Sequence, residues 1–236
     1  MPRNFVAFDI ETATIDLPEF TDWRQRRPLG ITCIASQTTA CDEPRIWFTK
    51  TTSGAPAACM TEEDISAFVS YLEEQRAAGF VSLTWNGLGF DFDVLAEESG
   101  RKAACRELAM GHVDMMFHVF CEKGFPVALD KVAAGMGLPG KTRGMSGKDA
   151  PRRWALGDHQ SVIEYVMQDV RVTLAVASAA ERGKGMAWIT GQGKRAWMSL
   201  PVGWKTVEVA RKQPLPDTSW MSEPKPRSSF TAWLDG

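Results

Sequence analysis

The sequence predicts an α/β fold in which a mixed β-sheet is flanked by α-helices. Apolar runs of strand length come first, at Phe5–Ile10, Ile31–Ser36 and Arg45–Phe48. Longer stretches with apolar residues at helical spacing follow, and a further strand, Phe80–Trp85, is inserted among them. Strands that give way to helices, with one strand returning among those helices, are typical of a sheet covered by helices.

The length and composition favour one main domain with an extension. At 236 residues, 44% of them hydrophobic, the chain can bury a sizeable core. We assign residues 1–182 to the main domain and residues 183–236, which hold five of the nine Trp residues, to an extension of unknown role. No apolar run is long enough to cross a membrane. The five cysteines are scattered without a C-x-x-C pair, which suits a reducing compartment, so we expect a cytoplasmic protein.

Each predicted helix follows from its end signals or its spacing. Thr61 begins a sequence similar to a capping box, and Gly79 ends the helix behind it. Residues 12–28 and 137–151 combine Pro with charged residues and predict loops, the second of them mobile. The remaining helices are expected at about 91–99, 101–110, 114–123, 129–136 and from 158 or 161 to 182.

Three short motifs place acidic or polar side chains at defined points in this scheme. Asp9 and Glu11 are two residues apart on the first strand, so their side chains share one face. Residues 86–91 join a strand to a helix, and Tyr165 and Asp169 share one face of the long helix. Each motif alone has an ordinary explanation: solvated acids at a sheet edge, an N-cap and surface residues. Their occurrence together favours a common site.

The three motifs together resemble those of the DnaQ-like exonucleases of the ribonuclease H fold. The resemblance is to the DEDDy branch, which includes polymerase proofreading domains, and it covers about residues 4–178. The sister branch has His five residues before its last Asp, where this chain has Glu164. The family patterns D-x-E, N-x-x-x-[FY]-D and Y-x-x-x-D are matched by Asp9 and Glu11, by Asn86, Phe90 and Asp91, and by Tyr165 and Asp169.

The resemblance implies a 3′→5′ exonuclease that releases nucleoside 5′-monophosphates from single-stranded ends, with DNA favoured. Two Mg²⁺ or Mn²⁺ ions would be held by four carboxylates, which agrees with the preference of these cations for oxygen ligands. Tyr165 would orient the attacking water. The implied metal ligands are Asp9, Glu11, Asp91 and Asp169, and the implied contacts near the cleaved end are Thr12, Asn86 and Phe90.

The net charge of −2 conceals two basic stretches. Residues 141–153 and 182–212 hold 12 of the 27 Lys and Arg residues but only two acids. A basic surface suits a polyanion, whereas a solvated loop and helix end would explain the pattern equally well. From the first stretch we expect phosphate contacts by Lys141, Arg143, Arg152 and Arg153.

Several alternatives stay open at this point. An RNA-trimming exoribonuclease would use the same carboxylates, and a binding module would keep the fold without the chemistry. The Trp residues of the extension could stack on bases, or cover the core or a subunit interface, as in a homo-oligomer. Asp93 lies about 200° around a helix from Asp91 and is not expected to be a ligand. Asp114 could support the site or face solvent.

Overall fold

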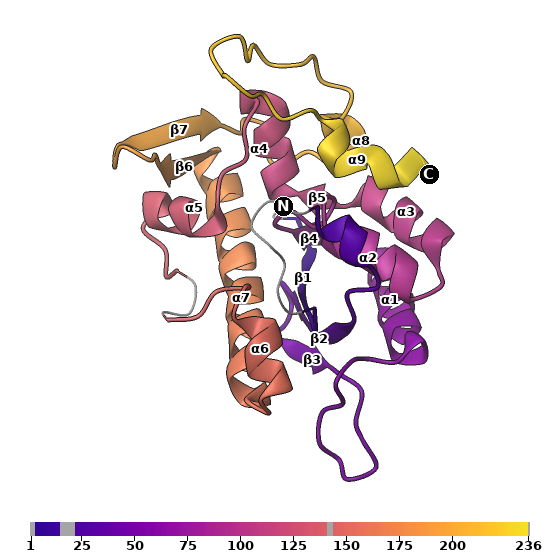
Figure 1. The fold of residues 1–236 in the computed structure, drawn as a ribbon. Coiled ribbons are helices and arrows are strands. Elements are labelled where there is room, and N and C mark those ends of the chain that lie inside the picture. The colour runs from indigo at the N-terminus through magenta and orange to yellow at the C-terminus, as the bar shows by residue number, and fades with distance from the viewer. Residues whose placement is uncertain (1–2, 15–21, 141–143, 236) are drawn as a thin grey trace.

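A mixed sheet forms the centre of the fold (Figure 1). The computed structural model describes residues 3–14, 22–140 and 144–235. The strand order is β3-β2-β1-β4-β5, with β1 antiparallel to β2 and parallel to β4. The predicted α/β class is therefore confirmed. The strands are β1 Phe5–Thr12, β2 Ile31–Thr38, β3 Arg45–Trp47, β4 Val81–Thr84 and β5 Val113–Asp114.

The helices follow the predicted order, with additions. The 137–151 segment was predicted to be a loop throughout, but its last two residues open the short helix α6. The described part of the 12–28 segment includes a 3₁₀ helix, η1, at Trp23–Arg26. The α-helices are α1 Glu62–Ala77, α2 Asp91–Glu98, α3 Lys102–Gly111, α4 Met115–Lys123, α5 Leu129–Met136, α6 Ala150–Ala155, α7 His159–Gly183, α8 Val207–Ala210 and α9 Ser228–Asp235.

Alternate residues of β1 enter two hydrophobic cores, one on each face of the sheet. Val6 and Phe8 pack with α1, α2 and α3. Phe5 and Ala7 pack with α5, α6 and α7 on the other face. Because side chains alternate along a strand, the odd-numbered residues of β1 continue to face α7 up to the end of the strand.

The C-terminal segment packs back onto the body of the domain. It contains the hairpin of β6 (Gly185–Ile189) and β7 (Arg195–Ser199), and β6 lies against α5. Trp188, Trp204 and Trp233 are buried, which favours the core-covering alternative for these three residues. Trp197 and Trp220 keep 48% and 68% of their surface exposed.

The last described helix, α9, braces the turn between β4 and α2. The Trp233 indole N–H donates to the Leu88 carbonyl at 2.7 Å. The Phe230 ring lies so close to Gly89 that a Cβ there would approach it to 3.0 Å. None of the helices in the described ranges is both long and apolar enough to span a bilayer.

Candidate active site

The first predicted motif lies on β1 and faces α7. Glu11 is buried and Asp9 is half-buried. Glu11 lies opposite Cys33 of β2. Burial is the main cause of the raised pKa of the Cys33 thiol, and the negative charges of Glu11 and Asp9 raise it further. Thr12 follows an irregularity in the strand register and is half-buried where β1 ends.

The second motif meets the first through a hydrogen bond to the backbone of β1. Strand β4 pairs with β1 only as far as Ala7, so the edge of β1 beyond that point is available to α2. Asp91, the first residue of α2, is buried, and its Oδ1 accepts from the Ile10 N–H at 3.2 Å. Ile10 lies between Asp9 and Glu11, so the Asp91 carboxylate at the start of α2 meets β1 at the stretch that carries the other two predicted carboxylates.

The turn between β4 and α2 is held in shape by local constraints. Asn86 has a left-handed backbone with φ 76°. Gly87 lies against the Thr84 side chain so closely that a Cβ would overlap it, which requires glycine at this position. Phe90 is half-buried at the N-cap of α2. The turn therefore presents Asn86, Phe90 and Asp91 in a fixed relation.

The Asp114 carboxylate supports this turn by accepting hydrogen bonds from its backbone. Asp114 is 1% exposed, and its carboxylate accepts from the N–H groups of Asn86 at 3.0 Å and Leu88 at 2.9 Å. It also accepts from the Phe117 N–H at 3.0 Å and so caps α4. Burial raises the pKa of Asp114 to about 6, although the N–H donors lower it. The solvent-facing alternative for Asp114 is wrong.

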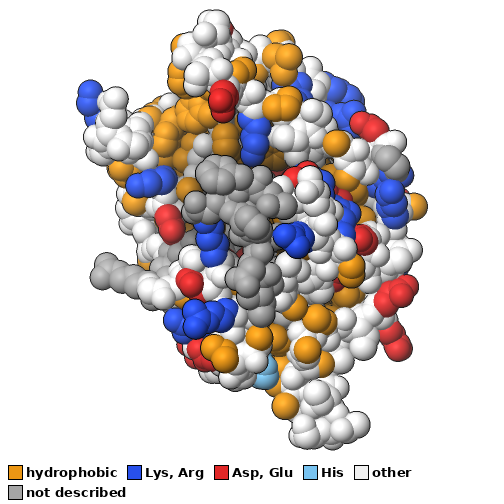
Figure 2. All heavy atoms as spheres, in the orientation of Figure 1, with side chains coloured by type: hydrophobic (Ala, Val, Ile, Leu, Met, Phe, Trp, Pro, Cys, Tyr) orange, Lys and Arg blue, Asp and Glu red, His pale blue; other side chains and the backbone are white. Residues whose placement is uncertain are grey.

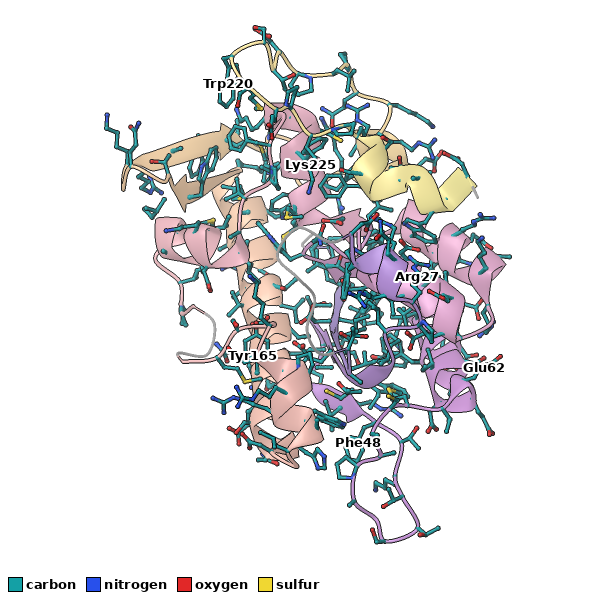
Figure 3. The ribbon with its side chains drawn as sticks, in the orientation of Figure 1. Arg27, Phe48, Glu62, Tyr165, Trp220 and Lys225 are labelled. Carbon is teal, nitrogen blue, oxygen red and sulfur yellow. The ribbon has the colours of Figure 1, made fainter. Side chains whose placement is uncertain are left out.

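The third motif lies on the buried face of α7. Tyr165 and Asp169 are 3% and 4% exposed, and they share that face with Val166, which belongs to the core between α7 and the sheet. Helix α7 packs directly on β1 and β2. Tyr165 and Asp169 therefore lie in the layer between α7 and the sheet, on the side of the sheet that Asp9 and Glu11 face. Figure 3 shows Tyr165 on α7, beside the loop that leads to α6.

The first basic stretch borders this layer. The Gln168 side-chain amide of α7 donates to the Gly140 carbonyl at 3.0 Å. A Cβ on Gly147 would lie 3.9 Å from the Tyr165 hydroxyl. The loop thus approaches α7 at both of its described ends. Its predicted phosphate contacts Lys141 and Arg143 lie outside the described residues.

The two remaining predicted phosphate contacts lie on α6. Arg152 is exposed, and Arg153 pairs with Asp158 at 3.1 Å. The second basic stretch begins at the other end of α7, away from α6. Helix α7 has 25 residues and spans about 37 Å. At its far end Arg182 and Lys184 line a cavity of about 970 Å³ near the start of β1. Figure 2 shows Lys and Arg side chains, in blue, spread over the face of the molecule that it draws.

Four carboxylates are a donor set that suits Mg²⁺ or Mn²⁺. In the described part of the chain, no three Asp, Glu, His or Cys side chains form a group that could hold an ion as they stand. The residue types therefore fit a divalent cation, and their arrangement around one stays a prediction.

Sequence reasoning missed the residues that hold η1 beside the second motif. Asp93 turns away from Asp91 and pairs with Arg24 and Arg27. These arginines lie in a charged segment that has no helical or strand periodicity. The only signal in the sequence was an Asp on the apolar side of a short helix.

Comparisons with known proteins identify the type of domain. A model of the ribonuclease H superfamily matches residues 49–180, a range that contains Asp91, Tyr165 and Asp169 but not β1. A family B DNA polymerase from the hyperthermophilic archaeon Pyrobaculum calidifontis is similar in structure, with a TM-score of 0.53 and 21% identity over 77% of this chain. The match spans 24% of the polymerase, so at this identity it shows a shared fold alone.

A second solved structure, of exonuclease I, has a TM-score of 0.45 and 14% identity. That match covers 77% of this chain and 41% of exonuclease I. A search of curated proteins found no match.

Proposed function

This chain belongs to the ribonuclease H superfamily, and on that premise we propose that it is a metal-dependent 3′→5′ exonuclease acting on single-stranded nucleic acid, with DNA favoured. The observation that carries the proposal is the hydrogen bond from the Ile10 N–H to Asp91. It joins the second motif to the strand that bears Asp9 and Glu11. The buried face of α7 adds Tyr165 to the same layer.

Four carboxylates would hold two Mg²⁺ or Mn²⁺ ions: Asp9, Glu11, Asp91 and Asp169. Bound ions of this kind neutralise charge on the cleaved phosphodiester and make a hydroxide available at neutral pH. A phenol keeps its proton near neutral pH, so the Tyr165 hydroxyl would orient the attacking water by a hydrogen bond rather than deprotonate it.

The substrate strand would extend from this layer towards the basic loop. Gly147 approaches the Tyr165 hydroxyl, and the next residue is Lys148, followed on α6 by Arg152 and Arg153. These Lys and Arg side chains would neutralise the phosphates upstream of the cleaved end. Such charge neutralisation is the main source of affinity for a single strand that is bound without sequence preference.

The test is hydrolysis of a 5′-labelled single strand, as DNA and as RNA of the same sequence, with Mg²⁺ or Mn²⁺ and with EDTA. We expect products that shorten one nucleotide at a time from the 3′ end, only with a metal ion and faster for DNA. Absence of cleavage of either strand with either metal would falsify the exonuclease proposal, and faster RNA trimming would favour the exoribonuclease alternative.

Asp9→Asn keeps the shape of the side chain and removes its charge, so we expect it to abolish hydrolysis. The matched control is Glu164→Gln, because Glu164 is exposed on α7, one position before Tyr165. Cleavage by Asp9→Asn within about tenfold of the wild type would remove Asp9 from the metal-binding set.

A further inference from the structure

The β6–β7 hairpin has one free edge. Strand β7 pairs with β6 in a register that is unbroken over its five residues. Helix α5 packs on β6, so closely that a Cβ on Gly135 would overlap the Trp188 backbone. Figure 1 shows the hairpin at the periphery of the molecule, with β7 farther from α5 than β6 is. Within the described residues, the outer edge of β7 therefore has no neighbouring strand.

The hydrogen bonds at the two ends of the hairpin show which backbone groups of β7 point outward. The Thr190 N–H donates to the Lys194 carbonyl at 2.8 Å, and the Leu200 N–H donates to the Lys184 carbonyl at 2.9 Å. Bonded and non-bonded pairs alternate along an antiparallel ladder, so the even-numbered residues of β7 bond to β6. The residues whose N–H and C=O groups point away from β6 are Arg195, Trp197 and Ser199, and all three are exposed.

Strand β7 lacks the features that usually protect such an edge. Edge strands are commonly blocked by Pro, by a bulge or by a charged side chain that projects from the edge. Strand β7 has an ordinary length and contains no Pro and no bulge. Its one charged side chain, Arg195, is engaged elsewhere. The Arg195 Nε donates to the Gly135 carbonyl at 2.8 Å, and the guanidinium carbon lies 5.7 Å from the centre of the Trp197 ring.

The outer edge of β7 matches a second copy of itself. When two β7 strands run antiparallel about a twofold axis at Trp197, this residue lies opposite Trp197 of the second copy, and Arg195 lies opposite Ser199 of the second copy. Every outward N–H then meets an outward C=O, and each pair of opposite residues exchanges two hydrogen bonds. No like charges lie opposite each other in this register, and two aromatic residues meet at the axis, which is a favourable cross-strand pair.

We propose that β7 is a dimer interface, at which two copies of this chain join their hairpins into one four-stranded antiparallel sheet. The inference is independent of the proposed exonuclease function, because no candidate site residue lies on the hairpin. One pair of short strands buries less than the roughly 1,200 Å² of a stable interface, so we expect weak association with a Kd on the order of 1–100 µM. Each copy has one such edge, so the assembly closes at two copies.

Sedimentation velocity of the full chain measures this association. The weight-average mass should rise from that of one chain, 26.1 kDa, towards that of two as the concentration increases. Loading concentrations from about 1 to 300 µM span the expected Kd. A mass that stays at one chain throughout this range would overturn the proposal.

An exchange of charges tests whether residue 197 faces its own copy. Trp197→Lys and Trp197→Glu each place two like charges opposite each other, so each variant alone should stay monomeric. An equal mixture of the two should form dimers again, because opposite charges then face each other. The control is Trp220→Lys, at an exposed ring on the 214–226 segment, which should associate as the wild type does. Dimers of either single variant, a mixture that stays monomeric, or a monomeric control would each refute pairing through β7.

A second variant keeps the Trp197 ring, which lies over Gly185 of β6 and supports the hairpin. Ser199→Pro removes a donor from the outer edge and leaves the hydrogen bonds to β6 in place, because the Ser199 N–H points outward. We expect association at least about tenfold weaker than in the wild type, with an unchanged midpoint of urea denaturation. Association as strong as that of the wild type would contradict the proposed interface.

Discussion

The Asp114 carboxylate under the β4–α2 turn should make the stability of the protein depend on pH in an unusual direction. Its pKa is about 6, against an ordinary value of 3.8, because burial penalises the charged form. Between these two values the folded protein binds the proton more tightly than the unfolded chain does. Lowering the pH through this window therefore stabilises the fold through this group.

The size of the effect follows from the two pKa values. A difference of about two units corresponds to about 3 kcal/mol, of which about 2 kcal/mol is gained between pH 7 and pH 4. Asp114→Asn cannot titrate and lacks this gain. The free energy of unfolding of the wild type minus that of the variant should therefore rise by about 2 kcal/mol from pH 7 to pH 4.

Urea denaturation of both proteins at the two pH values measures this difference. Other titrating groups, such as the buried His112 and His118, are present in both proteins and cancel. A difference that stays constant with pH, or that falls in acid, would refute the reasoning, because Asp114 would then carry no raised pKa.

Three further predictions concern the site and its turn. Tyr165→Phe should lower kcat by roughly 10- to 1,000-fold with a smaller change in KM, as expected of a positioning hydroxyl; an unchanged single-turnover rate would make Tyr165 structural. Changing Arg152 and Arg153 to Ala should weaken binding of a long single strand and flatten the log–log salt dependence by about one unit. Turnover of a dinucleotide should stay the same in that variant, and an equal loss there would place the arginines at the cleaved end. Gly87→Ala should destabilise the protein by roughly 1–3 kcal/mol, because its Cβ meets Thr84; an unchanged urea midpoint would contradict this.

Local patterns were sufficient to predict most of the framework. The Thr61 hydroxyl accepts from the Asp64 N–H at 3.2 Å and starts α1 where the capping signal lies. Helix α6 was missed because it has six residues and lies in a segment rich in Gly, Pro and charge. The β6–β7 hairpin was missed because its strands have five residues each, and Trp and Gly obscure their alternation.

The positions of the candidate site residues on their strand and helices were predictable, but the contacts between those elements were not. Alternation along β1 places Asp9 and Glu11 on one face, and the buried face of α7 carries Tyr165. The contact between Asp91 and Ile10 depends on where β4 stops pairing with β1, which no local pattern records. The burial of Asp114 was not predictable either, because the N–H groups that donate to its carboxylate belong to residues 26 and 28 positions away along the chain.

The brace formed by α9 bears on when the turn between β4 and α2 reaches its final form during synthesis of the chain. The ribosome makes Asp9, Glu11, Asp91 and Asp169 before it makes residues 228–235, which supply Phe230 and Trp233 to the 86–91 turn. At about 5–20 residues per second, the interval from the end of α7 to the end of α9 lasts roughly 3–10 s. During that time a nascent chain carries all four carboxylates of the candidate site, yet the 86–91 turn lacks its contacts with α9. The 86–91 turn should therefore reach its final form only after residues 228–235 have been made and have packed against it.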